Sequence, residues 1–192
     1  FSFWYFVPLV MGLLFFILWR GTLRWVGAGL FTIMLPFILF QPRPAILISA
    51  ENSLVALKNV SGDIRINNLR RDSFVRENWE QLWGVEDGRA QLWPKEWPAE
   101  CDDRGCRTII EGRKIDYSLK PYSHKEDCAW ADLLVARDPV RIPCSVRVID
   151  KFDTYYHGAH SVYLNPAFII KTVKGEGSRR RAWSVNDPES KY

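Results

Sequence analysis

The chain has 192 residues, and its 26 lysine and arginine residues against 22 aspartate and glutamate residues give a formal net charge of +4. This length suits one domain, or a membrane segment followed by a smaller domain. Residues 1–42 contain no acid and only two arginines, so the remaining 150 residues carry a net charge of only +2. Such a balance argues against a domain that binds nucleic acid mainly through many lysine and arginine contacts to phosphates. Because the chain begins at Phe1, within apolar sequence, we expect it to be a piece of a longer protein.

The first 42 residues contain two long apolar runs. Residues 1–19 (FSFWYFVPLVMGLLFFILW) have no charged side chain, and residues 25–41 (WVGAGLFTIMLPFILFQ) form a second such run. At about 1.5 Å of rise per residue, each run is close to the thickness of a bilayer's hydrocarbon core. Tryptophans near the ends of the runs suit the membrane interface. The sequence therefore predicts a transmembrane helical hairpin over residues 1–42; a buried core hairpin is the alternative.

The link between the two runs, RGTLR, predicts how this hairpin is oriented. Its arginines, Arg20 and Arg24, favour a cytoplasmic loop, although Arg43 on the far side of the second run opposes them. The prediction is a multi-pass membrane protein whose C-terminal domain lies on the outer side of the membrane.

Residues 43–175 predict an α/β sandwich with a mixed sheet, built from about nine strands and two helices. Prolines in QPRP end the apolar segment, and the strands AILISA, SLVALKN and IRIN follow. A helix is expected over residues 71–84, then a loop over 85–104 and a β-hairpin over 106–119. A short helix over 121–131 leads into four strands, DLLVA, SVRVID, AHSVYL and AFIIKTV. Residues 176–192 form a polar tail that we expect to be partly disordered.

Two of the three histidines lie close together in FDTYYHGAHSVYL, residues 152–164. With the aspartates beside them they are candidate metal ligands, which would hold zinc or manganese in a hydrolytic site: Asp150, Asp153, His157 and His160. The alternative is a turn that enters a strand, with His157 exposed and His160 bonded to a backbone group; the glycine between the histidines favours it. The third histidine, His124, is expected to be solvated on an amphipathic helix.

The four cysteines all follow the apolar segment. They could form two disulfides in an oxidising compartment, or stay as thiols or bind zinc in a reducing one. The spacing in CDDRGC and the wide separation of the other two cysteines are unlike the tight pairs of zinc sites. For a domain outside the cytoplasm we favour, among three possible arrangements, the pairs Cys101–Cys106 and Cys128–Cys144.

Basic residues and tryptophans suggest a second kind of site, one that contacts DNA. The dense basic groups are Arg70, Arg71, Arg179, Arg180 and Arg181. Trp83, Trp93 and Trp97 could stack against the bases of a single strand. The alternative, favoured by the acids mixed among them, is that the arginines are solvated and that the tryptophans fill a small core or rest on a membrane surface.

The segment PRPAILISAENSLVALKN resembles the C-terminal part of ComEC-family competence proteins, inner-membrane channels for DNA internalisation, above all those of the α-proteobacterial type. The resemblance continues in order through FVRENW, CDDRGC, EDCAWADLLVAR, VIDKFDTYYHGAHSVYL and RRRAWS. It thus covers nearly the whole chain, including both apolar runs. It implies that residues 1–42 end the channel domain, and that residues 43–175 form a reduced metallo-β-lactamase-like domain.

In active members of this family the last domain is proposed to be a nuclease that degrades the strand that is not imported. Three of the ligand groups that the resemblance would place here are missing. The loop over 85–104 contains no histidine and offers only Asp87, Asp102 and Asp103, where a His-x-His-x-Asp-His cluster is expected. Lys120-Pro121 stands in place of a Gly-Asp pair, and Arg137-Asp138-Pro139 in place of a His-His-Gly motif. The resemblance therefore implies a degenerate, non-catalytic domain without a cofactor.

The leading hypothesis from the sequence is the C-terminal region of an inner-membrane channel that takes up single-stranded DNA in natural transformation. The domain after the hairpin would have a structural or DNA-guiding role. The implied partners are the membrane, single-stranded DNA through the full-length channel, and other DNA-uptake proteins. The alternatives are a metal-dependent nuclease that uses the candidate ligands around HGAH, and a periplasmic module that binds partner proteins.

Overall fold

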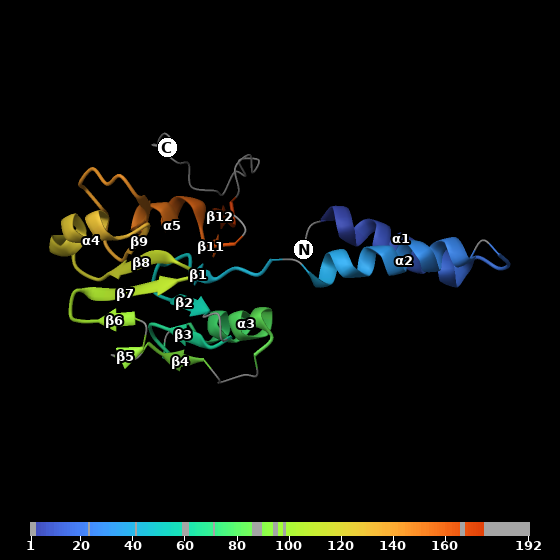
Figure 1. Ribbon diagram of the computed structural model, residues 1–192, viewed down its shortest axis with the longest axis horizontal. Coiled ribbons are helices and arrows are strands. Elements are labelled where there is room, and N and C mark those ends of the chain that lie inside the picture. Colours follow the sequence, from blue (N-terminus) through green and yellow to red (C-terminus); the bar gives the residue numbers. More distant parts are fainter. Residues whose placement is uncertain are drawn as a thin grey trace. The chain divides into compact units, whose positions relative to one another are not determined.

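The chain consists of two compact units, Phe1–Arg43 and Pro44–Tyr192. The computed structural model in Figure 1 describes residues 3–22, 24–40, 42–58, 62–70, 72–85, 90–93, 96–97, 99–165 and 168–174. The predicted DNA contacts of Arg71, Arg179, Arg180 and Arg181, and the predicted polar tail over 176–192, concern residues outside these ranges.

The first unit is a helical hairpin of α1 (Phe3–Leu18) and α2 (Arg24–Leu39). The turn between them includes Gly21, whose φ of 88° lies in the left-handed region that favours glycine. The two helices approach closely at Gly27, because a Cβ there would lie 2.6 Å from the carbonyl oxygen of Gly12 and from the backbone nitrogen of Phe16. Only a glycine fits this contact.

The helical hairpin does not match the predicted membrane segment. Each helix has 16 residues, which is about 24 Å at 1.5 Å per residue, whereas a membrane-spanning helix needs about 20 apolar residues. Within the described residues, no helix combines the length and the apolar character that crossing a membrane requires. The predicted transmembrane helices over residues 1–42, and with them the predicted multi-pass inner-membrane location, are therefore wrong.

The second unit contains two six-stranded sheets, which we name sheet A and sheet B. Sheet A is formed by β1 (Ile46–Ile48), β2 (Val55–Lys58), β3 (Ile64–Ile66), β4 (Gln91–Leu92), β11 (His160–Tyr163) and β12 (Ile169–Thr172). Its order is β12-β11-β1-β2-β3-β4. Neighbouring strands are antiparallel except β3 and β4, which are parallel.

Sheet B follows a similar mixed pattern. It is formed by β5 (Glu96–Trp97), β6 (Ala99–Cys101), β7 (Gly105–Ile110), β8 (Arg113–Ser118), β9 (Leu133–Ala136) and β10 (Arg147–Ile149). Its order is β10-β9-β8-β7-β6-β5. Strands β8, β9 and β10 are parallel to one another, and the remaining neighbours are antiparallel.

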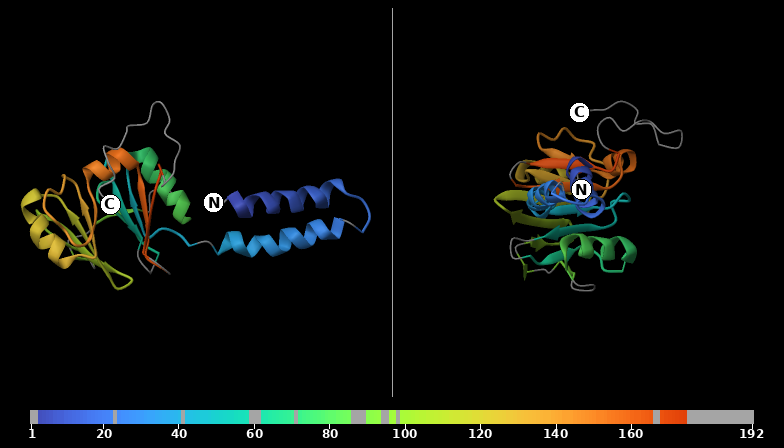
Figure 2. Two further views of the ribbon diagram at one scale, coloured as in Figure 1. Left: turned by 90° about the horizontal axis from the view of Figure 1, so that it is seen from above. Right: turned by 90° about the vertical axis from the view of Figure 1, so that its right-hand side faces the viewer.

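The two sheets pack face to face, with helices on their outer faces (Figure 2). These helices are α3 (Ser73–Trp83) beside sheet A, and η1 (Pro121–Ser123) with α4 (His124–Trp130) beside sheet B. Helix α5 (Lys151–His157) connects β10 of sheet B to β11 of sheet A. Because side chains alternate between the faces of a strand, each sheet contributes to the core between the sheets and to a core under its own helix.

Three apolar clusters correspond to these layers. The central cluster joins both sheets and includes Ile46, Ile48, Leu57, Ile115, Leu133, Val135 and Val162. The second lies under α3 and includes Leu47, Ala56, Ile66 and Trp83. The third lies under α4 and contains Cys128, Leu134 and Ala136.

The described part of the chain departs from the expected element pattern in three places. It has twelve strands in two mixed sheets, where about nine strands in one mixed sheet were expected. The predicted loop over 85–104 contains β4, β5 and β6. Residues Lys151–His157 form helix α5, which was not expected, and only Gly158 and the residue after it make the turn that enters β11.

Candidate functional site

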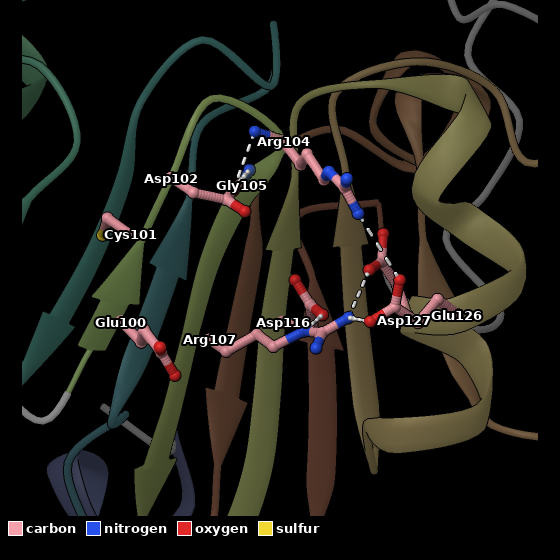
Figure 3. A pocket seen from close by; sticks show the side chains of 9 residues that line it. All are labelled: Glu100, Cys101, Asp102, Arg104, Gly105, Arg107, Asp116, Glu126 and Asp127. Carbon is pink, nitrogen blue, oxygen red and sulfur yellow. Dashed lines mark hydrogen bonds and ion pairs between the residues drawn. The ribbon is translucent and has the colours of Figure 1, made fainter.

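A strongly charged concavity lies on the outer face of sheet B, and we name it the acidic pocket (Figure 3). It has a volume of about 240 Å³. Strands β6, β7 and β8, the β6–β7 turn and helix α4 all contribute to its walls. The lining residues are Glu100, Cys101, Asp102, Arg104, Gly105, Arg107, Asp116, Glu126 and Asp127.

The tight β6–β7 turn brings the arginines of the pocket into place. Asp102 Oδ1 accepts hydrogen bonds from the backbone N–H groups of Arg104 (2.8 Å) and Gly105 (2.9 Å), and the bond from Arg104 is the main reason why the pKa of Asp102 is lowered. A Cβ at Gly105 would overlap the carbonyl oxygen of Tyr117 on β8, so this position must be glycine. The Cys101–Cys106 disulfide joins the two strands directly across the turn.

Arg107 is the centre of the charge network. It lies opposite Asp116 in the β7–β8 register. Its Nε donates to Asp116 Oδ2 at 3.0 Å, and its Nη2 donates to Glu126 Oε1 and Asp127 Oδ1, both at 3.1 Å. The guanidinium also lies 5.4 Å from the ring centroid of Trp130. One arginine thus ties helix α4 to the β7–β8 hairpin.

Two carboxyl groups of the pocket are deeply buried. Asp116 is 2% exposed and Asp127 is 4% exposed. Burial and the neighbouring charge of Asp127 raise the pKa of Asp116 to about 7, although Arg107 opposes this. Burial alone would lower the pKa of Arg107, but its hydrogen bonds to Asp127, Asp116 and Glu126 outweigh burial and raise it. The pocket therefore contains a fixed cation and a carboxyl group that exchanges a proton near neutral pH.

A second pocket, which we name the amide pocket, opens where strands β3, β8 and β9 end. It also has a volume of about 240 Å³, and it is lined by Asn52, Ser53, Asn67, Asn68, Tyr117, Leu119 and Arg137. Asn52 donates through Nδ2 to the carbonyl oxygen of Ala136 at 2.6 Å. Asn67 donates through Nδ2 to Tyr117 Oη at 3.1 Å and accepts from the N–H of Val55 at 2.9 Å. The amides of this pocket thus hold the strand ends together.

The four candidate metal ligands occupy the ends of α5. Asp150 caps the helix: its Oδ1 accepts from the N–H groups of Phe152 and Asp153, and its Oδ2 accepts from the N–H of Val140 at 3.0 Å. Asp153 completes a capping box by accepting from the N–H of Asp150 at 2.9 Å. Both aspartates are thus engaged with backbone N–H groups at the start of the helix.

The two histidines lie at and just beyond the other end of α5. His157 is the last residue of the helix, and His160 is the first residue of β11. His160 is buried, and its Nδ1 lies 2.8 Å from the carbonyl oxygen of Gly158. Burial raises the pKa of Asp153 to about 6 and lowers the pKa of His160. Across the described residues, no three His, Cys, Asp or Glu side chains are grouped to hold a metal ion.

Replacing Asp150 with alanine is expected to lower the free energy of unfolding by about 1–2 kcal/mol, because the N-terminal N–H groups of α5 lose their cap. Urea unfolding of the variant measures the loss. Asp150→Asn keeps one oxygen for the N–H groups of Phe152 and Asp153 but places an NH2 group against the N–H of Val140, so its loss should be smaller than that of the alanine variant but not zero. An alanine variant as stable as the wild type would contradict the capping role.

The remaining predicted site residues are spread over the fold. Arg70 is exposed after β3, and its N–H donates to Asn68 Oδ1 at 2.8 Å. Trp83, the last residue of α3, is buried in the apolar cluster of that helix and donates to the carbonyl oxygen of Pro44 at 2.9 Å, so the suggestion that it stacks on bases is wrong and the alternative that it fills a small core is confirmed. Trp93 packs edge-on against Tyr117 at 5.3 Å, and the side chain of Trp97 lies outside the described part.

His124 and the four cysteines are all placed by the structure. His124 is 3% exposed, so the expectation that it is solvated is wrong; it is buried because α4 packs closely onto sheet B. All four cysteines form disulfides, Cys101–Cys106 and Cys128–Cys144. These are the two pairs favoured among the three possible arrangements.

The acidic pocket was not expected from the sequence, although one signal for half of it was present. A hairpin over 106–119 that turns at 111–112 places Arg107 opposite Asp116, as the structure has it. Two opposite charges at directly opposed positions of a hairpin are close enough to interact. Glu126 and Asp127 join them only because α4 packs across the sheet, which no local pattern indicates.

No family model matches the chain, and no curated protein or solved structure is significantly similar to it.

Proposed function

We propose that residues 44–174 form a non-catalytic domain of a protein of the DNA-uptake machinery, with a structural role. In this proposal the domain is a degenerate relative of the metallo-β-lactamase-like domain of ComEC-family proteins. The ordered series of resembling segments along the chain supports the link to DNA uptake. The composition of the amide pocket supports the absence of catalysis, and it is the observation that carries this part of the proposal.

The amide pocket lies where the resemblance would place ligand groups. Strands β8 and β9 are adjacent and parallel, with Ser118 opposite Ala136, and the N–H of Arg137 donates to the carbonyl oxygen of Ser118 at 3.0 Å. The segments after the two strands, beginning at Leu119 and Arg137, therefore lie side by side at this pocket. Its lining offers amides, hydroxyls and one guanidinium rather than the imidazole and carboxylate ligands of hydrolytic metals.

The hydrogen bonds around α5 also support a structural role. Asp150 and Asp153 already accept from backbone N–H groups, and His160 is bonded at Nδ1 to a backbone carbonyl. Metal binding by these residues would require the helix to give up its cap, at a cost of about 1 kcal/mol or more. A contact between DNA and Arg70, Arg71 or Arg179–Arg181 stays a prediction.

The experiment that tests this proposal measures metal content and nuclease activity on the whole 192-residue chain, folded oxidatively. The protein is incubated with manganese or zinc and with single- and double-stranded DNA. We expect no stoichiometric metal and no cleavage. Cleavage that disappears in His160→Ala, but persists in the matched variant His124→Ala, would overturn the proposal and place a nuclease site at HGAH.

A further inference from the structure

Helix α4 is held on sheet B by a small apolar cluster and one network of charged side chains. The cluster contains three buried residues, Cys128, Leu134 and Ala136. The network runs from Arg107 on β7 to Glu126 and Asp127 on α4. Because the apolar cluster is small, the protonation state of the network should affect how tightly α4 packs.

Two buried carboxyl groups meet at the centre of this network. Asp116 on β8 and Asp127 on α4 are 2% and 4% exposed, and Figure 3 shows both beside the guanidinium of Arg107. Arg107 donates to Asp116 Oδ2 at 3.0 Å and to Asp127 Oδ1 at 3.1 Å. The other oxygen of Asp127, Oδ2, is buried and accepts no hydrogen bond from an N–H or hydroxyl group of the described residues. Buried polar atoms are almost always hydrogen-bonded, so this oxygen calls for a donor inside the network.

We propose that Asp116 and Asp127 share one proton, and that this proton holds helix α4 against strand β8. The two carboxyl groups lie within hydrogen-bonding reach of each other, so the protonated one donates to the ionised one. With the proton in place, Arg107 faces one negative charge from the pair. Without it, two carboxylates with little access to water repel each other and weaken the contact between α4 and β8. Such a pair would operate whether or not the domain belongs to the DNA-uptake machinery.

Acidic groups predominate among the charged side chains around Asp116. Its neighbour on β9, Leu134, is apolar, and His124 on α4 is buried one turn before Asp127. The charged groups on the surrounding elements are Arg107 on β7, Lys114 on β8, Glu126 and Asp127 on α4, Glu100 on β6, and Arg104 with Asp102 in the β6–β7 turn. Because negative neighbours disfavour ionisation of a buried acid, this surrounding favours a retained proton at Asp116.

The shared proton should be lost near neutral pH. Burial is the main reason why the pKa of Asp116 is raised to about 7 from an ordinary value of 3.8; the charge of Asp127 and the hydrogen bond to it add to the rise, while Arg107 opposes it. Because the pKa in the folded state lies above the ordinary one, the stabilising contribution of the proton is fully present below about pH 4 and is lost as the pH rises through about 7. Helix α4 should therefore pack less tightly at pH 8 than at pH 6.

The shared proton itself is tested by carbon-13 NMR of the aspartate carboxyl carbons in the full oxidised chain, between about pH 4 and about pH 9. The variants Asp116→Asn and Asp127→Asn identify the two resonances. We expect the Asp116 resonance to titrate near pH 7, and the Asp127 resonance to shift with the same midpoint, since one proton serves both groups. An Asp116 midpoint below about pH 5, or an Asp127 resonance that does not follow it, would overturn the proposal.

The effect on α4 is measured by hydrogen exchange of its backbone amides at pH 6 and pH 8, after correction for the pH dependence of the chemical exchange step. Loss of a proton with a pKa of about 7 should lower the protection factors about tenfold between these two pH values. Asp116→Asn keeps an N–H donor for Asp127 but cannot titrate, so its protection factors at the two pH values should agree within about twofold.

The matched control is Asp103→Asn, which changes an exposed aspartate of the β6–β7 turn and should retain the tenfold change. Wild-type protection of α4 that is equal at both pH values, or a tenfold change that persists in Asp116→Asn, would show that the proton does not hold the helix. The carboxyl titration and the wild-type exchange decide the question even where Asp116→Asn does not fold.

Discussion

Replacing Arg107 with methionine is expected to lower the free energy of unfolding by about 3–5 kcal/mol at pH 8, because two buried carboxylates lose the cation that they share. Asp116 and Asp127 are 2% and 4% exposed, and both accept hydrogen bonds from this guanidinium. Methionine keeps much of the length of the side chain, so the loss reports on charge rather than on a cavity. Urea unfolding at fixed ionic strength measures it.

The same variant should show a distinct pH dependence. In the folded wild type the pKa of Asp116 is raised to about 7 from an ordinary value of 3.8. A raised folded-state pKa means that this group's stabilising contribution is fully present below about pH 4 and is lost as the pH rises through about 7. Without Arg107 the pKa of Asp116 rises further, so the instability of the variant should shrink markedly between pH 8 and pH 5.

Arg104→Met is the matched control for this prediction. Arg104 is 54% exposed and makes one ion pair at 3.7 Å, to Glu126, and such surface pairs contribute about 0–1 kcal/mol. Equal losses for the two arginine variants, or a loss at Arg107 that does not change with pH, would show that the buried carboxyl groups do not depend on Arg107.

The structure shows which parts of this fold local sequence patterns can predict. The hairpin around Gly112 and the helix that ends at Gly84 follow from turn and cap residues. Strand β9 follows from its short apolar run, LLVA. In each case the residues that determine the element lie within a few positions of one another along the chain.

Helix α5 was missed although its signals are local. Asp150 and Asp153 have the spacing of a capping box, and Gly158 follows the last helical residue. The aromatic residues between them favour strands by propensity, and the short helix is stabilised by its cap.

The transmembrane prediction failed for a different reason. Apolar runs of 19 and 17 residues were treated as if each were helical from end to end. In the structure α1 ends at Leu18, before the end of the first run, and α2 ends at Leu39, before the end of the second. Hydrophobicity indicates where a chain avoids water, but it does not set the residue at which a helix ends.

The pockets could not be predicted as wholes, because each joins segments far apart in the sequence. The acidic pocket needs α4 to lie across β7 and β8, and the amide pocket needs the β1–β2 turn to meet the ends of β8 and β9. His124 illustrates the same limit, since its burial depends on how a seven-residue helix packs. Such contacts depend on tertiary packing that overrides local patterns.

Removing the Cys128–Cys144 disulfide by replacing both cysteines with alanine is expected to lower the free energy of unfolding by about 3 kcal/mol. The two residues are 16 apart in the sequence, so the bond removes substantial freedom from the unfolded chain. It also connects α4 to the segment before β10 within the apolar cluster under that helix. Guanidinium unfolding, with mass spectrometry to count free thiols, measures the effect.

The other disulfide provides the matched comparison. Cys101 and Cys106 are only 5 residues apart, and the β6–β7 register already places them opposite each other. The loop-entropy relation gives about 2 kcal/mol for a loop this short, and the hydrogen bonds of the hairpin hold much of the same geometry. Replacing this pair with alanines should therefore cost less than replacing Cys128 and Cys144. The reverse order would mean that the β6–β7 turn, and with it the arrangement of Arg104 and Arg107 in the acidic pocket, depends on the disulfide more than on the strands that it connects.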